Sequence, residues 1–124
     1  MTAADARGHV LEAARLFNSG HYFEAHEVLE DALESVPEDA WELFVGLVRI
    51  AVGYHKVTQH LWSGAARMLE LGLRTLAPFP DDAAGVRLAV LRQRVQADLD
   101  QLRAGTFDGD AFMRRPPRLQ PLRG

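Results

Sequence analysis

The chain of 124 residues contains no cysteine. Disulfide frameworks, zinc ribbons and thiol catalysis are therefore excluded. It also lacks a long apolar run, because the longest, residues 43–54, is interrupted by Arg49 and is too short to cross a bilayer. Residues 1–5 lack the basic start and apolar core of a signal peptide. We therefore expect a cytoplasmic protein that makes no contact with membranes.

Basic charge is scarce in most of the chain. The net charge is −3, yet four of the 14 basic residues lie after residue 110, which leaves ten bases against 17 acids before that point. Nucleic-acid-binding domains carry their basic charge on the folded part, so nucleic acid is a disfavoured partner. The four terminal arginines have three interpretations: plain disorder, contact with the acidic face of a neighbouring subunit, or weak, salt-sensitive contact with nucleic acid. We rank these interpretations in that order, and the partner expected for the chain is another protein or a second copy of itself.

No segment alternates with the period of a strand, and apolar residues recur with helical spacing between Gly, Ser and Pro breaks. The pattern predicts a single all-α domain over residues 1–113, followed by a basic, proline-rich, flexible tail over residues 114–124. Trp41 and Trp62 are expected to fill the core. The third of the expected helices is apolar almost all round, which is typical of a central, buried helix. About five helices are expected, over residues 4–18, 22–35, 37–55, 65–76 and 82–104. The last is expected to have Asp81 or Asp82 as its N-cap and Gly105 as its C-cap.

The chain also contains a weak internal repeat. The spacing of Gly20, Ala25, Ala32 and Pro37 resembles the second half of a tetratricopeptide unit, and residues 64–78 form a degenerate copy. Small residues at matching positions permit close contact between helices. We therefore expect helix hairpins that pack in a tetratricopeptide-like manner.

A longer and more specific pattern covers about half of the chain. Residues 17–30 read Phe-Asn-Ser-Gly-His-Tyr-Phe-Glu-Ala-His-Glu-Val-Leu-Glu, and they are followed by Trp41. Residues 46–55 then read Gly-Leu-Val-Arg-Ile-Ala-Val-Gly-Tyr-His, and Gly64-Ala65 comes later. This arrangement resembles the bacterial and archaeal family called domain of unknown function 309. The resemblance implies a small multihelical bundle, and it implies no activity, because none defines the family.

Polar residues on apolar helix faces are the candidates for a functional site. His26 and His55 lie on the apolar stripes of the second and third expected helices, so both imidazoles point into one interface if these helices pack together. Glu30 is one turn beyond His26. Arg49 lies within an apolar segment and needs a partner, for which Glu24, Glu27 and Glu30 are the nearest candidates.

This cluster has two interpretations. In the first, His26, Glu27, Glu30, Arg49 and His55 form a hydrogen-bonded network that sets how two helices pack. In the second, His26, Glu30 and His55, together with Glu27, bind a divalent metal such as zinc or iron, or a small ligand, and support hydrolysis. The spacing matches no known metal motif, so we favour the structural network. The favoured function is accordingly a non-enzymatic helical binding or scaffold domain, and enzymatic activity is left open.

Overall fold

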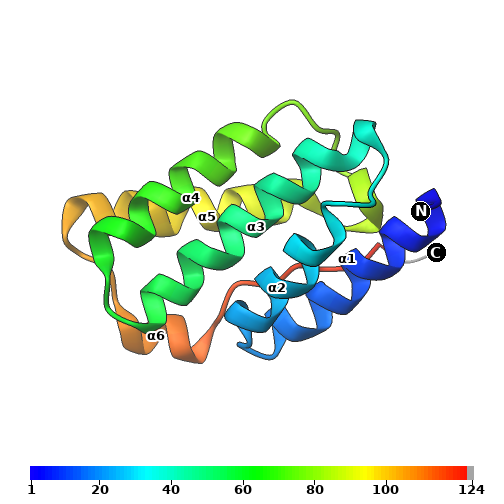
Figure 1. Ribbon diagram of the computed structural model, residues 1–124. Coiled ribbons are helices and arrows are strands. Elements are labelled where there is room, and N and C mark those ends of the chain that lie inside the picture. Colours follow the sequence, from blue (N-terminus) through cyan, green and yellow to red (C-terminus); the bar gives the residue numbers. More distant parts are fainter. Residues whose placement is uncertain (123–124) are drawn as a thin grey trace.

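The computed structural model describes residues 1–122, and it confirms the all-α class predicted from the sequence (Figure 1). Six α-helices and one short 3₁₀ turn make up the regular structure of this part of the chain, which has no strand beyond an isolated two-residue bridge. The elements are α1 (Ala3–Asn18), α2 (Tyr22–Ala32), α3 (Glu38–Thr58), α4 (Trp62–Leu76), η1 (Ala83–Gly85), α5 (Leu88–Ala104) and α6 (Gly109–Arg114).

Helix α3 occupies the middle of the molecule, as its apolar composition predicted. It lies between α2 and α4, while α1 packs on α2 and α5 packs on α4 (Figure 1). Phe44, Ile50 and Tyr54 are among its fully buried side chains. The helices α3 and α4 approach closely at Gly53, which has no side chain. A Cβ atom at this position would lie only 2.7 Å from Leu69 Cδ2. Each helix thus packs on its neighbours in sequence, while the tetratricopeptide-like geometry of this packing stays a prediction.

The ends of the helices are set by local hydrogen bonds. Thr2 and Asp5 form a capping box at the start of α1, which satisfies backbone N–H groups that lack helical partners. Gly105 ends α5 with a φ of 72°, as predicted for a left-handed C-cap. The expected start of this helix near residue 82 is wrong, because a turn and the 3₁₀ element η1 come before α5 begins at Leu88. Asp81 accepts a hydrogen bond from the backbone N–H of Ala89, in the first turn of α5. Helix α6 was not predicted.

Both tryptophans lie at the surface, contrary to the prediction that they fill the core. Trp41 and Trp62 are each 43% exposed. On α3 the core positions near Trp41 are occupied by Leu43 and Phe44, which are both buried. On α4 the small residue Ala65, rather than Trp62, enters the core.

Residues 115–122, within the segment expected to form a flexible tail, run in an extended course along the bundle. The amide of Asn18, at the end of α1, donates to the carbonyl oxygen of Leu119 at 3.0 Å and accepts from its N–H at 2.7 Å. The backbone N–H of Arg87 donates to the carbonyl oxygen of Gln120 at 2.8 Å. Because Leu119 is only 3% exposed, its burial adds an apolar contribution to this docking. The last two residues of the expected tail lie outside the described part of the chain.

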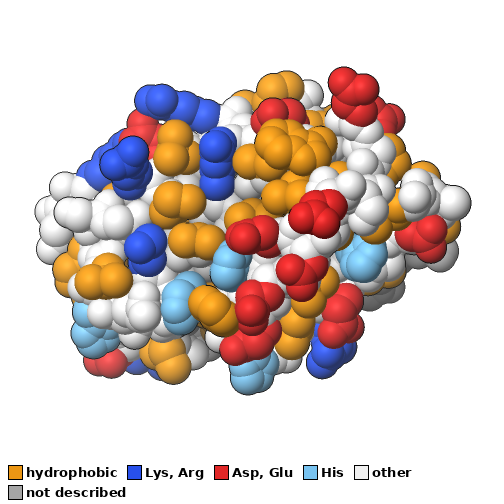
Figure 2. Space-filling model, in the orientation of Figure 1, with side chains coloured by type: hydrophobic (Ala, Val, Ile, Leu, Met, Phe, Trp, Pro, Cys, Tyr) orange, Lys and Arg blue, Asp and Glu red, His pale blue; other side chains and the backbone are white. Residues whose placement is uncertain are grey.

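Charged side chains are segregated on the face formed by α2, α3 and α4. Helix α2 carries four carboxylates and no lysine or arginine. Lys56, Arg67 and Arg74 lie on the opposite side of this face, toward α4. Figure 2 shows acidic side chains gathered over α2, basic ones over α4, and apolar ones between them. Within residues 1–122, no helix combines the length and apolar character needed to cross a bilayer.

Candidate functional site

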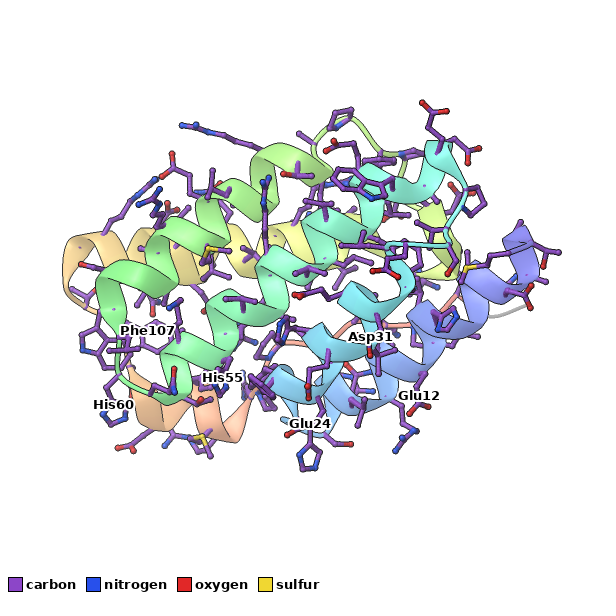
Figure 3. All side chains as sticks on the ribbon, viewed as in Figure 1. Glu12, Glu24, Asp31, His55, His60 and Phe107 are labelled. Carbon is purple, nitrogen blue, oxygen red and sulfur yellow. The ribbon has the colours of Figure 1, made fainter. Side chains whose placement is uncertain are left out.

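The two histidines of the predicted cluster meet at Phe23 rather than at a shared carboxylate. The ring of Phe23, on α2, lies 5.1 Å from that of His26 and 5.2 Å from that of His55, measured between centroids. The Nδ1 atom of His26 lies 2.8 Å from the carbonyl oxygen of Phe23, and its Nε2 atom lies 3.1 Å from Glu30 Oε2. Figure 3 shows His55 where α3 passes α2. The predicted pair of His26 and Glu30 is therefore present. His55 is connected to this pair only through the ring of Phe23, which contacts both histidines.

The structure does not assemble the predicted metal ligands. Among residues 1–122, no group of three or more His, Asp or Glu side chains is arranged to hold a metal ion. Glu27, the additional candidate, is exposed and forms neither a hydrogen bond nor an ion pair within this part of the chain. His26, Glu30 and His55 thus do not converge on a common centre, and the arrangement gives no support to a divalent metal at this place.

Arg49 contacts α4, whereas the prediction placed its partner on α2. Its Nη1 atom donates to Thr75 Oγ1, on α4, at 2.6 Å. The Thr75 hydroxyl donates in turn to the carbonyl oxygen of Leu71 at 2.8 Å. Arg49 and His55 are six positions apart, which places the two side chains roughly 120° apart around the helix. Arg49 therefore faces α4 while His55 faces α2, and they cannot share one cluster.

The charged group that is most deeply buried lies elsewhere, on α5. Asp98 is 7% exposed, and it is the buried charged residue of the described part of the chain. Its Oδ2 atom accepts a hydrogen bond from the hydroxyl of Tyr54 at 2.6 Å and another from Arg94 Nε at 2.9 Å. Two donors compensate the carboxylate for its loss of hydration. This network ties α3 to α5.

Two tyrosines share this environment and stay protonated at neutral pH. Burial raises the pKa of Tyr22 to about 12, with Arg94 acting in the opposite direction and Asp98 in the same one. Burial raises the pKa of Tyr54 well above its usual value, and the charge and the hydrogen bond of Asp98 raise it further. Tyr54 is thus a hydrogen-bond donor, and the network stabilises the packing of α3 against α5.

A sequence signal for Asp98 exists but was not used. Leu91, Val95 and Leu102 follow the spacing of an apolar helix face, and Asp98 falls at the missing position of that series. A polar or charged residue within an apolar stripe is the same signal that identifies His26 and Arg49 as candidates on the second and third helices. On α5 this signal indicates a buried carboxylate that needs partners.

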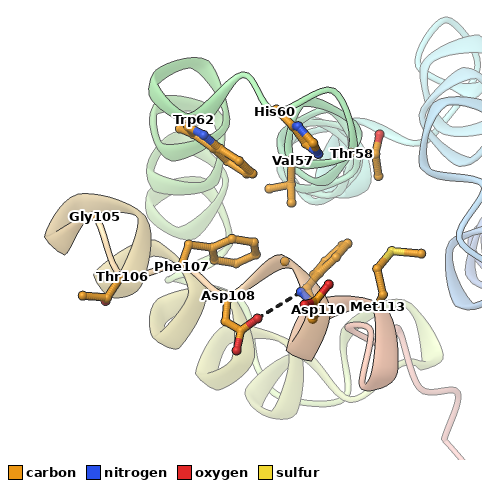
Figure 4. Close-up of a pocket in the computed structure, with 12 residues that line it drawn as sticks. Val57, Thr58, His60, Trp62, Gly105, Thr106, Phe107, Asp108, Asp110 and Met113 are labelled. Carbon is orange, nitrogen blue, oxygen red and sulfur yellow. Dashed lines mark hydrogen bonds between the residues drawn. The ribbon is translucent and has the colours of Figure 1, made fainter.

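An open groove of about 840 Å³ lies between the turn that joins α3 to α4 and the segment that contains α6 (Figure 4). Three aromatic residues line it: Trp62, Phe107 and Phe112. Trp62 contacts Phe107 with centroids 5.7 Å apart, and it stacks on the ring of His60 at 5.2 Å with an angle of 14° between the planes. Met113 also lines the groove and is 74% exposed. The groove therefore exposes the apolar side chains of Trp62 and Met113 to solvent.

The charged side chains of the groove are two carboxylates, Asp108 and Asp110. Asp108 also caps α6 by accepting from the backbone N–H groups of Asp110 and Ala111 (Figure 4). No lysine or arginine is among the lining residues. The groove can therefore attract a cation through its carboxylates and through the faces of its aromatic rings.

Comparison with known proteins agrees with the resemblance read from the sequence. The model of the family described as "Domain of unknown function (DUF309)" matches residues 10–68. An uncharacterized protein of Aquifex aeolicus (strain VF5) is 28% identical over 82 residues, which make up 65% of this chain and 25% of that protein. The chain thus spans about a quarter of the length of the curated relative it matches.

Proposed function

We propose that this chain, in which residues 10–68 match the model of the DUF309 family, is a non-enzymatic binding domain. Its ligand is a basic segment of a partner protein, which enters the groove between the α3–α4 turn and α6. The observation that carries the proposal is the combination, in one open groove, of an aromatic lining with carboxylates as the charged groups.

The size of the groove fits a few side chains of a peptide. Pockets that bind small ligands have volumes of roughly 300–1,000 Å³, and this groove holds about 840 Å³. Trp62 at 43% exposure gives a flat apolar surface that a ligand would cover. Tryptophan is enriched among the residues that dominate protein interfaces, because it buries a large area at low conformational cost.

The charge of the groove selects the chemistry of the ligand. An arginine or lysine side chain can lie against the exposed part of the Trp62 indole, which also contacts His60 and Phe107, while its charged end approaches Asp110. Each such contact at an exposed site contributes only about 0.5–1 kcal/mol, so apolar neighbours of the basic residue must add to the affinity. The expected ligand is a basic residue flanked by apolar ones.

The test uses tryptophan fluorescence. The chain has two tryptophans, and Trp41→Phe leaves Trp62 as the reporter in the groove. We would titrate this protein with the capped peptide Leu-Arg-Leu and with its counterpart Leu-Glu-Leu. The basic peptide should give a saturable change with a Kd below about 1 mM, and the acidic peptide should give none.

Two matched variants locate the binding. Asp110→Asn should weaken the basic peptide about threefold, which is typical of an exposed charge pair. Asp100→Asn removes an exposed carboxylate of α5 outside the groove, and it should leave the Kd unchanged. Equal responses to both peptides, or no saturable response to either, would contradict the proposal.

A further inference from the structure

A second surface feature is independent of the groove and lies on the outer side of α3. Trp41, Val45, Val48, Val52 and His55 follow one another at intervals of four, three, four and three residues. Trp41 is 43% exposed, and the valines are partly exposed although they belong to the central helix. We call Trp41, Val45, Val48 and Val52 the α3 seam.

The spacing of the α3 seam is that of a coiled-coil contact. Alternating steps of four and three residues place apolar side chains along one line of a helix, as at the a and d positions of a heptad repeat. Val45 and Val52 occupy one of the two positions, and Trp41 and Val48 occupy the other. A monomer that leaves such a row in water loses the stabilisation that its burial would provide.

The charges on either side of the α3 seam are opposite in sign. Glu27 and Asp31 are exposed on α2, and Arg67 is exposed on α4, where Lys56 of α3 lies beside Gly64. Figure 2 shows acidic side chains on one side of this face and basic ones on the other. Neither Glu27 nor Arg67 forms an ion pair within residues 1–122. A face that is acidic on one side and basic on the other is complementary to itself.

We propose that the α3 seam is the centre of an interface between two copies of this chain, related by a two-fold axis that runs alongside α3. A rotation of 180° about that direction turns one copy onto the other and places each α2 over the α4 of the other copy. Acidic side chains then face basic ones on both sides of the seam. A two-fold axis across α3 would instead place α2 over α2, and like charges would repel.

The register of the helices supports this orientation. Both α2 and α4 run opposite to α3, since Phe23 contacts His55 and Gly53 adjoins Leu69. Counting along the helices from these contacts places Glu27 and Arg67 at heights on α3 that differ by roughly 6 Å. Two long side chains bridge such an offset, so Glu27 of one copy can pair with Arg67 of the other.

The experiment measures the mass of the full chain in solution by sedimentation velocity over a range of protein concentrations. The wild type should dimerise in a concentration-dependent manner, and added salt should weaken the dimer. Val48→Glu places a carboxylate in the seam and should raise the dimer Kd at least tenfold. Val90→Glu, at an exposed position of α5, is the matched control and should leave the Kd unchanged.

Charge reversal gives a second test that does not alter the seam. Arg67→Glu should weaken the dimer, and adding Glu27→Arg should restore it, because the pair is then reversed in both halves of the interface. This pair decides the question if Val48→Glu fails to fold. Trp62→Ala, which alters the groove, should dimerise as the wild type does, so failure of the groove hypothesis and failure of this one are distinguishable.

A wild type that stays monomeric up to about 1 mM, the affinity of a very weak complex, would overturn the proposal and assign the seam to a different protein. A dimer whose Kd is unaffected by Val48→Glu would overturn it as well. The same holds if Glu27→Arg fails to rescue Arg67→Glu.

Discussion

Replacing Tyr54 by phenylalanine removes a single hydroxyl group and leaves the aromatic ring in place between Phe17 and Phe112. The hydroxyl donates to Asp98 at 2.6 Å, and a hydrogen bond to a charged group contributes about 1.5–3 kcal/mol to stability. Arg94 still pairs with the carboxylate in the variant, so the charge is not left unpartnered. We therefore expect Tyr54→Phe to lower the free energy of unfolding by about 2 kcal/mol.

A double-mutant cycle with Asp98→Ala isolates the contribution of this hydrogen bond. Asp98→Ala leaves the hydroxyl of Tyr54 buried without its acceptor, which adds a desolvation penalty to the lost bond. The double variant should therefore be more stable than the sum of the single effects predicts, by about 1–2 kcal/mol. Urea unfolding followed by helical circular dichroism gives these values, and the m-value should be unchanged if the native fold is kept.

The matched control is Tyr22→Phe. The hydroxyl of Tyr22 makes no hydrogen bond within residues 1–122, so its removal should change stability by less than about 0.5 kcal/mol. The reasoning is refuted if Tyr54→Phe costs no more than Tyr22→Phe. Strict additivity in the cycle would refute it too, because independent sites do not share a bond.

Three further predictions concern pH, the extended segment and helix packing. Burial raises the pKa of Tyr22 to about 12 and that of Tyr54 above its usual value. The free energy of unfolding should therefore be unaffected by these tyrosines below about pH 10 and should decline as the pH rises toward 12, because the unfolded chain then holds fewer protons than the folded one. Detection of tyrosinate in the folded protein near pH 10 by ultraviolet titration would contradict this. Leu119→Ala should lower the unfolding free energy by roughly 2–3 kcal/mol, whereas a flexible tail predicts no change in melting. Gly53→Ala should destabilise the protein by about 1–2 kcal/mol, because the added methyl group collides with α4. Gly8 has open space around it on α1, so Gly8→Ala should stabilise the protein by up to about 1 kcal/mol. Equal effects of the two substitutions in thermal melting would argue against close packing of α3 on α4.

The candidate cluster illustrates how far sequence patterns reach into a site. The His26–Glu30 contact was predictable because residues four apart on a helix are neighbours whatever surrounds them. The partner of Arg49 was predicted wrongly, since spacing along α3 gives the angle between side chains but does not say which helix lies on each side. The groove was missed because its walls come from segments distant in sequence, the α3–α4 turn and residues 105–113.

The sequence by itself determined the helical class, the breaks between the first four helices, the glycine cap of α5 and the family pattern of residues 17–65. Each of these depends on backbone preferences and on residues within a few positions of one another. Only the tertiary structure decided that Tyr54 meets Asp98, 44 positions away, and that Asn18 holds Leu119, 101 positions away. These pairings follow from the distance and rotation at which helices pack, which are properties of the assembled core and cannot be read from any one segment.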